Sequence, residues 1–465
     1  MPTWTAPYET REGAFDEALL PDGAPRPGYG PLIEAITPEP AAALDEVARS
    51  LDERGVVFGS GESRQAFKVD PLPRLFEAGE WDRVEAGLIQ RVRALNLFLE
   101  DAYRERRIVE AGIVPARVLD ESILYEPIMR NGPSVPVAHV AGPDLIRDAT
   151  GRFRVLEDNL RTPSGLTYAI AGREAVAGSP RLPALPVRGL EGAYDLLRDT
   201  IRSADPTGGG DPAMALLSDG PVATAWYEHR ELADRLGIPL VTPGDLETGD
   251  RLTARADGAA IEIDVLYNRS SSESLRDRNG VLTPLGTLLA GPIESGRLAC
   301  VNSFGTGIAD DKAAYCYVEA MIRFYLDEIP LLESVPCLDL GEAEAFATAI
   351  ERIDELVFKP RWEFGGHGIV FGPGATAAEL RDLETRLNEA PADYVAQEPV
   401  SLSVHPTVAG DRLEPRRVDF RPFVYTRGDD VTVLPGGLSR FAGSTDELVV
   451  NSTQGGGAKD TWVLL

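Results

Sequence analysis

The segment from residue 356 to residue 372, LVFKPRWEFGGHGIVFG, constrains the fold most strongly. Lys359 stands at the end of one apolar strand, a turn with Gly365, Gly366 and Gly368 follows, and a second apolar strand runs back. A phosphate loop that opens a helix carries its lysine after the glycines, whereas here the lysine comes first. Glycine lets backbone N–H groups approach oxyanions closely, and Lys359 adds a compact cation. The order therefore predicts a hairpin lid that closes over phosphates, with ATP as the first ligand to test.

Lysine is rare in this chain, which makes each of its positions informative. Only four of the 46 basic residues are lysines, Lys68, Lys312, Lys359 and Lys459. A site that needs a flexible point charge does not readily accept a planar guanidinium, so a lysine kept in an arginine-rich chain favours a functional role. For Lys68 the simpler interpretation is a surface lysine left by compositional drift.

Length and charge bound the class of protein. The 465 residues suffice for about three compact units, and multi-domain α/β is the expected class. No run of about 18 apolar residues predicts a membrane span, and the start, MPTWTAPYETREGAFDEALL, contains early acids and no apolar signal core. A formal net charge of −28 disfavours nucleic acids and acidic membrane surfaces as partners.

The cysteines and histidines show no metal-binding pattern. Cys300, Cys316 and Cys337 are widely spaced and lack the groupings of zinc sites, which fits a reduced cytoplasm as the expected location. The four histidines also lack metal spacing and are expected to be structural, except that His367 lies inside the predicted lid.

Periodicity predicts the main elements. Residues 81–107 place apolar side chains at three- to four-residue spacing, which predicts an amphipathic helix. Farther on, VPVAHV (135–140) and RFRVLEDN (152–159) flank DLIRDATG and predict an antiparallel strand pair closed by a turn. A strand, a helix and a strand between residues 213 and 245 predict a parallel βαβ unit, with Gly237 at the helix cap. A long helix is expected over 309–327.

Carboxylate and amide side chains gather in RVLEDNLRTPSG. Strand alternation places Glu157 and Asn159 on one face and Asp158 on the other. Oxygen ligands suit Mg²⁺, which takes few protein ligands and completes its shell with water and nucleotide phosphates. Asp144, on the flanking segment, could complete the set. An ordinary solvated strand face is the alternative interpretation.

Lys312 is expected in the first turn of a helix, where the helix dipole disfavours a cation. Either Asp310 and Asp311 compensate it as a cap cluster, or a bound phosphate does. At the other end of the chain, NSTQGGGAKDTWVLL repeats the order of glycines, lysine and strand, and its alternative interpretation is a tight hairpin with a solvated Lys459.

Two later strands end in polar residues. In YVAQEPVSLS an extended backbone from Gln397 could pair with adenine, and Glu398 could accept a bond from a ribose hydroxyl. In RRVDFRPFVY, Arg417, Asp419 and Arg421 share a face and offer charge to a developing acyl phosphate, or form an ordinary surface ladder.

Seven segments together resemble the circularly permuted type 2 ATP-grasp proteins, relatives of the synthetase domain of glutathionylspermidine synthase. They are LEDNLRTPSG, ADDKAAY, FKPRWEFGGHG, YVAQEPVSLS, RRVDFRPFV, PGGLSR and NSTQGGGAKDTWVL. EWDRVEAGLIQRVRALNLFLEDAY and YEHRELADRLGIPLV match as well, so the resemblance spans the chain. It implies an α/β (α+β) class, a circularly permuted ATP-grasp fold with a largely helical N-terminal region.

The resemblance also implies four regions along the chain. Residues 1–115 would form the helical N-terminal region and residues 116–180 the strands of the Mg²⁺ site. Residues 181–300 would form an α/β unit like that preceding an ATP-grasp core, and residues 301–465 the subdomains with lid, hinge and C-terminal glycine loop.

Site roles follow from the same resemblance. Asp144, Glu157 and Asn159 would hold Mg²⁺, and Lys312 and Lys359 would contact the nucleotide phosphates. The remaining implied residues are Gly365, Gly366 and Gly368 in the lid, Gln397, Glu398 and Val400 in the adenine hinge, and Arg421 near the transferred phosphoryl group. Ser164, in the TPSG loop beside the predicted metal strand, is a further candidate for contact with a substrate carboxylate. The Mg²⁺ residues precede the hinge, which is the permutation itself.

The implied activity is that of an ATP-dependent carboxylate–amine ligase, with ATP and Mg²⁺ as cofactors. A carboxylate is phosphorylated, an amine attacks the acyl phosphate, and ADP and phosphate leave. The expected partners are a small-molecule acid and an amine, such as an amino acid, a peptide or a polyamine. Glutathione and spermidine themselves are not implied, because Gly142 stands where glutathionylspermidine synthases carry an arginine. A non-catalytic nucleotide-binding scaffold and an ATP-grasp phosphotransferase are the alternatives.

Overall fold

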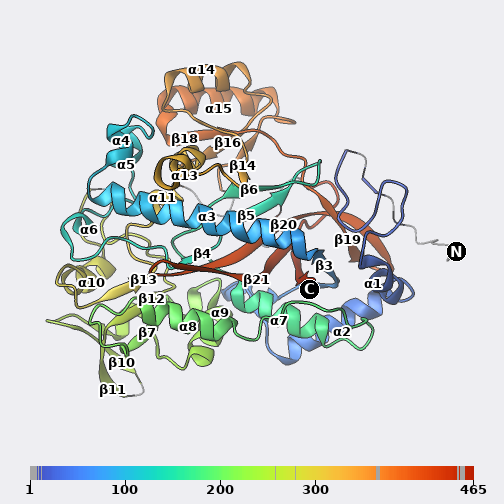
Figure 1. Cartoon of the computed structure of the whole chain (residues 1–465), viewed down its shortest axis with the longest axis horizontal. Helices are drawn as coiled ribbons and strands as arrows, with labels where there is room; N and C mark the ends of the chain where they lie inside the picture. The colour runs from blue at the N-terminus through green and yellow to red at the C-terminus, as the bar shows by residue number, and fades with distance from the viewer. Residues whose placement is uncertain are drawn as a thin grey trace.

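A large sheet forms the centre of the molecule (Figure 1). The computed structural model describes residues 8, 10–11, 13–256, 258–277, 279–362, 367–447, 450 and 456–465, and for Glu62 only the backbone. Its strands are β3 (Val69–Phe76), β4 (Val140–Ala141), β5 (Asp144–Arg147), β6 (Phe153–Glu157), β14 (Glu333–Ser334), β19 (Val404–Ala409), β20 (Arg412–Arg427), β21 (Asp430–Phe441) and β22 (Gly457–Val463). They follow the order β14-β6-β5-β20-β21-β22-β3, and β4 and β19 also pair with β20. Segments from both ends of the chain thus share one sheet.

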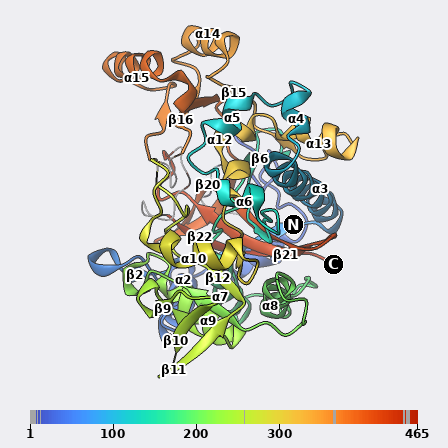
Figure 2. The ribbon, with the colours of Figure 1, turned by 90° about the vertical axis from the view of Figure 1, so that its left-hand side faces the viewer.

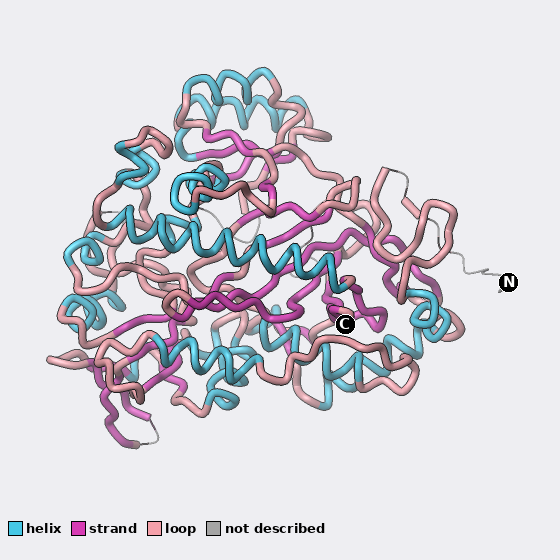
Figure 3. Tube along the Cα trace, viewed as in Figure 1, coloured by secondary structure: helices cyan, strands magenta, loops and turns pink. Residues whose placement is uncertain are grey.

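Helices cover both faces of this sheet. On one face lies α3 (Ala78–Tyr103), and on the other lie α2 (Pro40–Glu53), α7 (Leu166–Ala177) and α8 (Ala193–Ser203), so that helices and strands form three layers (Figures 1 and 3). The helix predicted over 81–107 is confirmed in α3. Its apolar stripe is at most 2% exposed and comprises Trp81, Val84, Leu88, Val92, Leu95, Phe98 and Ala102. Burying that stripe against the sheet stabilises the helix.

A second sheet is parallel. Its order is β13 (Ala299–Val301), β12 (Val265–Asn268), β7 (Met214–Leu217) and β8 (Leu240–Val241). The predicted βαβ unit is confirmed, since α9 (Trp226–Leu236) joins the parallel strands β7 and β8. Gly237 ends α9 at a φ of 64°, a left-handed conformation that glycine adopts without steric cost. Beside this sheet lie α10 (Pro284–Glu294), β9 (Leu246–Glu247), β10 (Leu252–Ala256) and β11 (Ala259–Ile263).

A third, antiparallel sheet forms a small unit with its own core. It contains β15 (Cys337–Asp339), β18 (Tyr394–Gln397), β16 (Val357–Pro360) and β17 (Val370–Phe371), and it carries α14 (Ala343–Glu351) and α15 (Ala377–Glu389). Figure 2 shows this unit at the end of the molecule opposite to β10 and β11. The predicted hairpin is confirmed, because Val357 of β16 pairs with Phe371 of β17. Gly365 and Gly366 lie outside the described residues.

Short elements complete the fold. They are α1 (Tyr29–Ile36), α4 (Arg107–Glu110), α5 (Ala116–Asp120), α6 (Pro127–Asn131), α11 (Gly307–Asp310), α12 (Lys312–Tyr315), α13 (Val318–Leu326), β1 (Val57–Phe58) and β2 (Gln65–Ala66). The four regions predicted from the sequence stay a prediction.

One predicted strand partner is wrong. β6 lies within RFRVLEDN as expected, but it pairs with β5 rather than with the segment 135–140. Only Val140 of that segment belongs to a strand, β4, which pairs with β20. The charged ends of β5 concealed a buried strand, because Asp144 and Arg147 are buried in ion pairs. The predicted turn is confirmed, since Gly151 N donates to Asp148 O.

The single helix expected over 309–327 is also wrong. The chain forms α11, α12 and α13 in its place. Asp311 has an extended conformation, with φ −67° and ψ 131°, and its carboxylate accepts a bond from Ala313 N. The same carboxylate pairs with Arg361 at 2.7 Å, and both side chains are fully buried. This buried ion pair fixes a break in the helix that apolar periodicity does not reveal.

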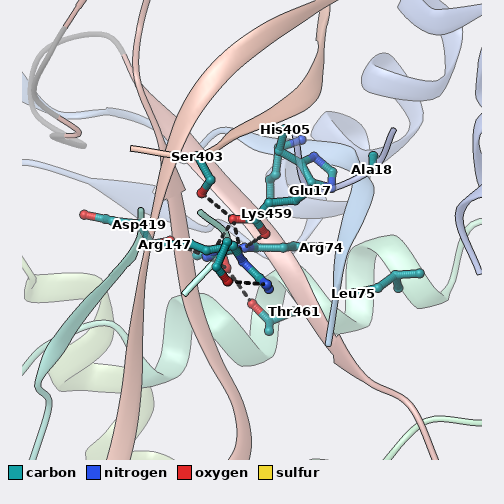
Figure 4. A network of polar contacts seen from close by, with 12 residues as sticks. Glu17, Ala18, Arg74, Leu75, Arg147, Ser403, His405, Asp419, Lys459 and Thr461 are labelled. Atoms are coloured by element: carbon teal, nitrogen blue, oxygen red, sulfur yellow. Dashed lines mark hydrogen bonds and ion pairs between the residues drawn. The ribbon is translucent and has the colours of Figure 1, made fainter. Parts of the chain in front are cut away.

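Lys459 is buried rather than solvated, which corrects the interpretation of the C-terminal hairpin. It is 2% exposed, and its ammonium donates to the Asp70 carboxylate and to Pro406 O at 3.0 Å. In the same polar network, Arg74 pairs with Glu17 at 2.6 Å (Figure 4). A charge buried with its partners contributes to the structure only if that pairing is kept. Lys459 therefore fastens the C-terminal strand to β3 and β19.

Candidate functional site

A cavity of about 350 Å³ lies between the large sheet and the small antiparallel sheet. Residues of β5, β6 and β20 line it from the large sheet, and residues of β16 and β18 line it from the small one. It gathers seven residues singled out from the sequence: Asp144, Glu157, Asn159, Lys312, Lys359, Gln397 and Arg421. Positions far apart in the chain thus meet at one site.

Two carboxylates oppose each other in this cavity. Asp144 and Glu157 are directly paired across β5 and β6. Burial, and then the nearby Asp144 carboxylate, raise the pKa of Glu157, while Lys359 and Lys312 oppose that shift. Asn159 lies beside the pair and donates from Nδ2 to Gly142 O at 3.1 Å, which leaves its side-chain oxygen as an acceptor. Two close carboxylates disfavour double ionisation, and a divalent cation would relieve their repulsion.

Two arginines hold the Asp144 carboxylate. Arg421 donates from Nε and Nη2 to its two oxygens, both at 2.6 Å, and Arg440 Nη2 adds a third bond at 2.9 Å. Although burial alone would raise it, Arg421 and Arg440 hold the pKa of Asp144 well below its usual range. Asp144 is therefore ionised, and Arg421 is fixed at the floor of the cavity.

Two lysines lie near the carboxylates in the cavity. Lys359, at 7% exposure, extends from β16 of the small sheet, and burial lowers its pKa while the Glu157 charge opposes that shift. Lys312 begins α12 and also lines the cavity. Of the two neighbouring acids, Asp311 caps α12, whereas Asp310 accepts bonds from the backbone of Leu160 and Arg161. The cap interpretation therefore applies to Asp311 alone.

One end of the cavity is apolar. Leu156, Ile369 and Val395 line it together with Gln397. Gln397 Nε2 donates to Leu156 O at 3.2 Å, but Gln397 Oε1 is buried and has no hydrogen-bond partner among the described residues. A buried acceptor without a donor is costly, so this end is suited to a flat apolar ligand that carries an N–H group.

Four predicted site residues lie outside the lining of the cavity: Gly368, Glu398, Val400 and Ser164. Glu398 accepts two bonds from Arg352, at 2.7 and 2.9 Å. Ser164 Oγ accepts a bond from Arg269 Nη2, and the Ser164 carbonyl oxygen accepts one from Arg421 Nη1 at 3.4 Å. Ser164 therefore lies directly behind the arginine of the cavity.

Sequence reasoning missed several polar residues of the lining. Arg161, Thr162, Glu273 and Arg440 line the cavity, and so does Asp310, which the sequence suggested only as part of a helix cap. Arg161 pairs with Glu273 and, at 3.0 Å, with Asp310. Arg440 and Arg161 both lie in motifs quoted above, PGGLSR and LRTPSG. Each pairs with a residue more than 100 positions away, Asp144 and Glu273, and Arg440 also pairs with Asp419 at 2.6 Å.

One histidine lies at the cavity and three are buried elsewhere, in line with the expectation from the sequence. His367 lines the cavity. His139, His229 and His405 are buried, and His405 bonds through its ring nitrogens to Pro406 O and Tyr29 Oη. Burial, aided by the Lys459 charge, holds the pKa of His405 well below its usual range, so this ring is neutral and structural.

The residues present fit a metal–nucleotide complex. In the part of the chain that the structure describes, no three His, Cys, Asp or Glu side chains are grouped to hold a metal ion. The two carboxylates and one amide of the cavity instead match the few protein ligands that Mg²⁺ takes when it shares phosphate oxygens. The unpaired Gln397 acceptor and the two lysines suit the other parts of a nucleotide.

The order of the site-forming strands along the chain is characteristic of the protein family. The strands with the opposed carboxylates, β5 and β6, precede β16, β17 and β18 of the small sheet along the chain. The chain belongs to the circularly permuted ATP-grasp type 2 family, whose model matches residues 73–442. The resemblance and the fold class predicted from the sequence are confirmed.

Relatives support this assignment over nearly the whole chain. A protein of Frankia casuarinae named "Putative glutamate--cysteine ligase 2-2" is 40% identical over 97% of this chain and 53% of its own length. An uncharacterized protein of Synechocystis is 37% identical over 97% of both chains. The chain spans about half the length of the Frankia relatives that it matches. A glutathione synthetase-like effector from Globodera pallida shares the fold, with a TM-score of 0.58 and 14% identity, over 96% of this chain and 100% of its own.

Among the described residues, no helix has the length and apolar character needed to span a membrane.

Proposed function

We propose that this chain is an ATP-dependent carboxylate–amine ligase that acts through an acyl phosphate and releases ADP and phosphate. The observation that carries the proposal is that one cavity contains apolar side chains with an unpaired buried acceptor, two lysines and two opposed carboxylates. Family membership supports it, and so do the ligase name of the Frankia relatives and the glutathione synthetase-like fold. The proposed location is the cytoplasm.

Different residues of the cavity would bind different parts of the Mg²⁺-ATP complex. The apolar end would take adenine, with the exocyclic amine donating to Gln397 Oε1. Lys312 and Lys359 would neutralise the phosphates. Asp144, Glu157 and Asn159 would hold Mg²⁺, which when bound supplies electrostatic stabilisation to the transferring phosphoryl group.

The acid would bind near Arg421. This guanidinium is preorganised by its two bonds to Asp144, so it can stabilise charge that develops on a neighbouring carboxylate or phosphoryl oxygen without reorganising. Ser164 is the proposed contact for the substrate carboxylate, because its loop packs behind Arg421. Glu398 would reach a ribose hydroxyl only after giving up bonds to Arg352. The lid residues Gly365, Gly366 and Gly368 and hinge residue Val400 would close the site by backbone contacts.

ADP release tests the proposed function. The full chain is incubated with Mg²⁺-ATP and pairs drawn from amino acids, small peptides and polyamines, and ADP and new products are measured together. A ligase releases ADP only when both an acid and an amine are present, and an amide product accumulates. ATP binding without ADP release under any pair would indicate a nucleotide-binding scaffold. A stable phosphorylated product would indicate a phosphotransferase.

A further inference from the structure

Two of the three cysteines meet beside the cavity. Cys316 directly follows α12, Cys337 begins β15, and their sulfur atoms lie 2.6 Å apart although 21 positions separate them in the chain. Both residues are free thiols with intermediate exposure. Cys300 is buried at 4% exposure in another part of the fold, on β13. The chain therefore contains one closely matched thiol pair and one isolated thiol.

The pair lies directly behind two residues of the cavity. Cys316 Sγ approaches Lys312 O at 3.6 Å, one turn earlier in the chain. Cys337 is the register partner of Gln397 in the ladder between β15 and β18. Cys337 also interacts electrostatically with the Lys359 ammonium. The cysteine pair is thus next to or interacts with three residues of the proposed nucleotide site, Lys312, Gln397 and Lys359.

The two cysteines lie on different elements, although both side chains pack against the large core. Ala313, Ala314 and Tyr315 of α12 are part of the large core that includes α3. β15 is an edge strand of the small antiparallel sheet, whose helices α14 and α15 have a separate core. A covalent bond between the two sulfur atoms would therefore connect the end of α12 to an edge strand of the small sheet.

We propose that Cys316 and Cys337 form a reversible disulfide, a redox modification site that ties α12 to β15 at the edge of the small sheet. The 2.6 Å separation of the sulfur atoms is only slightly longer than a disulfide bond of about 2.05 Å. No metal or further protein is needed, because a low-molecular-weight disulfide supplies the oxidising equivalents.

The reaction is a double thiol–disulfide exchange. In the proposed sequence Cys337 attacks first, and Cys316, whose pKa is raised by burial, attacks second. The Cys337 thiolate attacks one sulfur of the reagent, a mixed disulfide forms, and one reagent thiol leaves. Cys316 then loses its proton and attacks the Cys337 sulfur, and the second reagent thiol leaves. The two protein thiols are oxidised and the reagent disulfide is reduced to two thiols.

A consequence for activity rests on the proposed function. If closing and opening of the small sheet admits ATP and releases ADP, a cross-link between α12 and β15 slows nucleotide exchange. The formation of the disulfide itself does not depend on any reaction in the cavity. An experiment can therefore refute the effect on nucleotide exchange without refuting the formation of the disulfide, and the reverse.

Oxidised glutathione is the probe that tests the modification. The reduced full-length chain is treated with it, excess reagent is removed, and intact mass and peptide maps are recorded. We expect a mass lower by two hydrogen atoms, a peptide link between residues 316 and 337, and full reversal by dithiothreitol. Cys300→Ala is the matched control and should still form the link, whereas Cys316→Ser and Cys337→Ser should lose it.

Three results would overturn the proposal: all three thiols remain reduced, a glutathione adduct persists without the internal link, or the link involves Cys300. In parallel, the dissociation rate of a fluorescent ATP analogue is compared before and after oxidation. A rate at least several-fold lower in the oxidised chain, absent in both serine variants, supports the effect on the site. An unchanged rate with the link present would overturn that effect.

Discussion

Replacing Glu126 with glutamine should change how the stability of the protein depends on pH. Glu126 lies just before α6 and is 1% exposed. Its Oε1 accepts a bond from Leu275 N at 2.5 Å, while Oε2 is buried without a hydrogen-bond partner among the described residues. Burial raises the pKa of this carboxyl from 4.5 to about 7, although the backbone of Leu275 opposes the shift.

The sign follows from the raised pKa. Between pH 4.5 and 7 the folded state holds a proton that the unfolded state has lost, so stability falls as pH rises through this window and levels off above it. A shift from 4.5 to about 7 corresponds to about 3 kcal/mol at alkaline pH. Roughly 2 kcal/mol of this loss falls between about pH 5.5 and about pH 8.5.

Glutamine keeps the carbonyl oxygen that receives Leu275 N–H and never ionises. The free energy of unfolding of Glu126→Gln, measured in urea against the parent protein, should therefore gain about 2 kcal/mol relative to the parent between about pH 5.5 and about pH 8.5. Glu121→Gln, an exposed residue nearby, is the control and should show no such gain. A difference between parent and variant that does not change with pH would refute the reasoning.

Three further substitutions test the site and the structure that supports it. Lys359→Ala should weaken ATP binding by roughly ten- to a hundredfold, about 1.5 to 3 kcal/mol, while the exposed Lys68→Ala should not; equal affinities by calorimetry would reject the phosphate contact. Gln397→Ala should lower the affinity for ATP by about fivefold or more but leave inorganic triphosphate binding unchanged, and an equal loss for both ligands would argue against an adenine contact. Asp158→Ala should destabilise the fold by about 3 to 5 kcal/mol, because it leaves Arg91 buried without the carboxylate that it pairs with at 2.6 Å; a change below about 1 kcal/mol in urea unfolding would contradict this.

Local sequence patterns predicted several elements of the fold. The apolar stripe of α3, the hairpin of β16 and β17 and the cap at Gly237 each depend on neighbours within a few positions, and each was predictable. Strand alternation predicted opposite faces for Glu157 and Asp158, but both line the cavity, and Asp158 also pairs with Arg91. Asp144 and Gln397 were proposed as site residues from their places beside polar strand ends, and both line the cavity.

Buried charges account for what the sequence concealed. Asp144 and Arg147 made β5 look like a loop, and the Asp311–Arg361 pair interrupts a helix that periodicity alone would continue. Lys459 stands in a glycine-rich context like that of Lys359, yet its ammonium is paired with Asp70. In each case the partner lies at least 50 positions away, so the local sequence cannot distinguish a structural charge from a functional one.

The stoichiometry of turnover tests the central claim most directly. ADP and amide product are quantified together for the parent chain and for Glu157→Gln, with an active acid and amine pair identified by the screen. Equal amounts of ADP and amide from the parent, none when either substrate is omitted, and loss of turnover with retained adenosine nucleotide binding in Glu157→Gln are predicted. ADP formed without acid or amine, or full turnover by Glu157→Gln at ordinary Mg²⁺ concentration, would contradict the account.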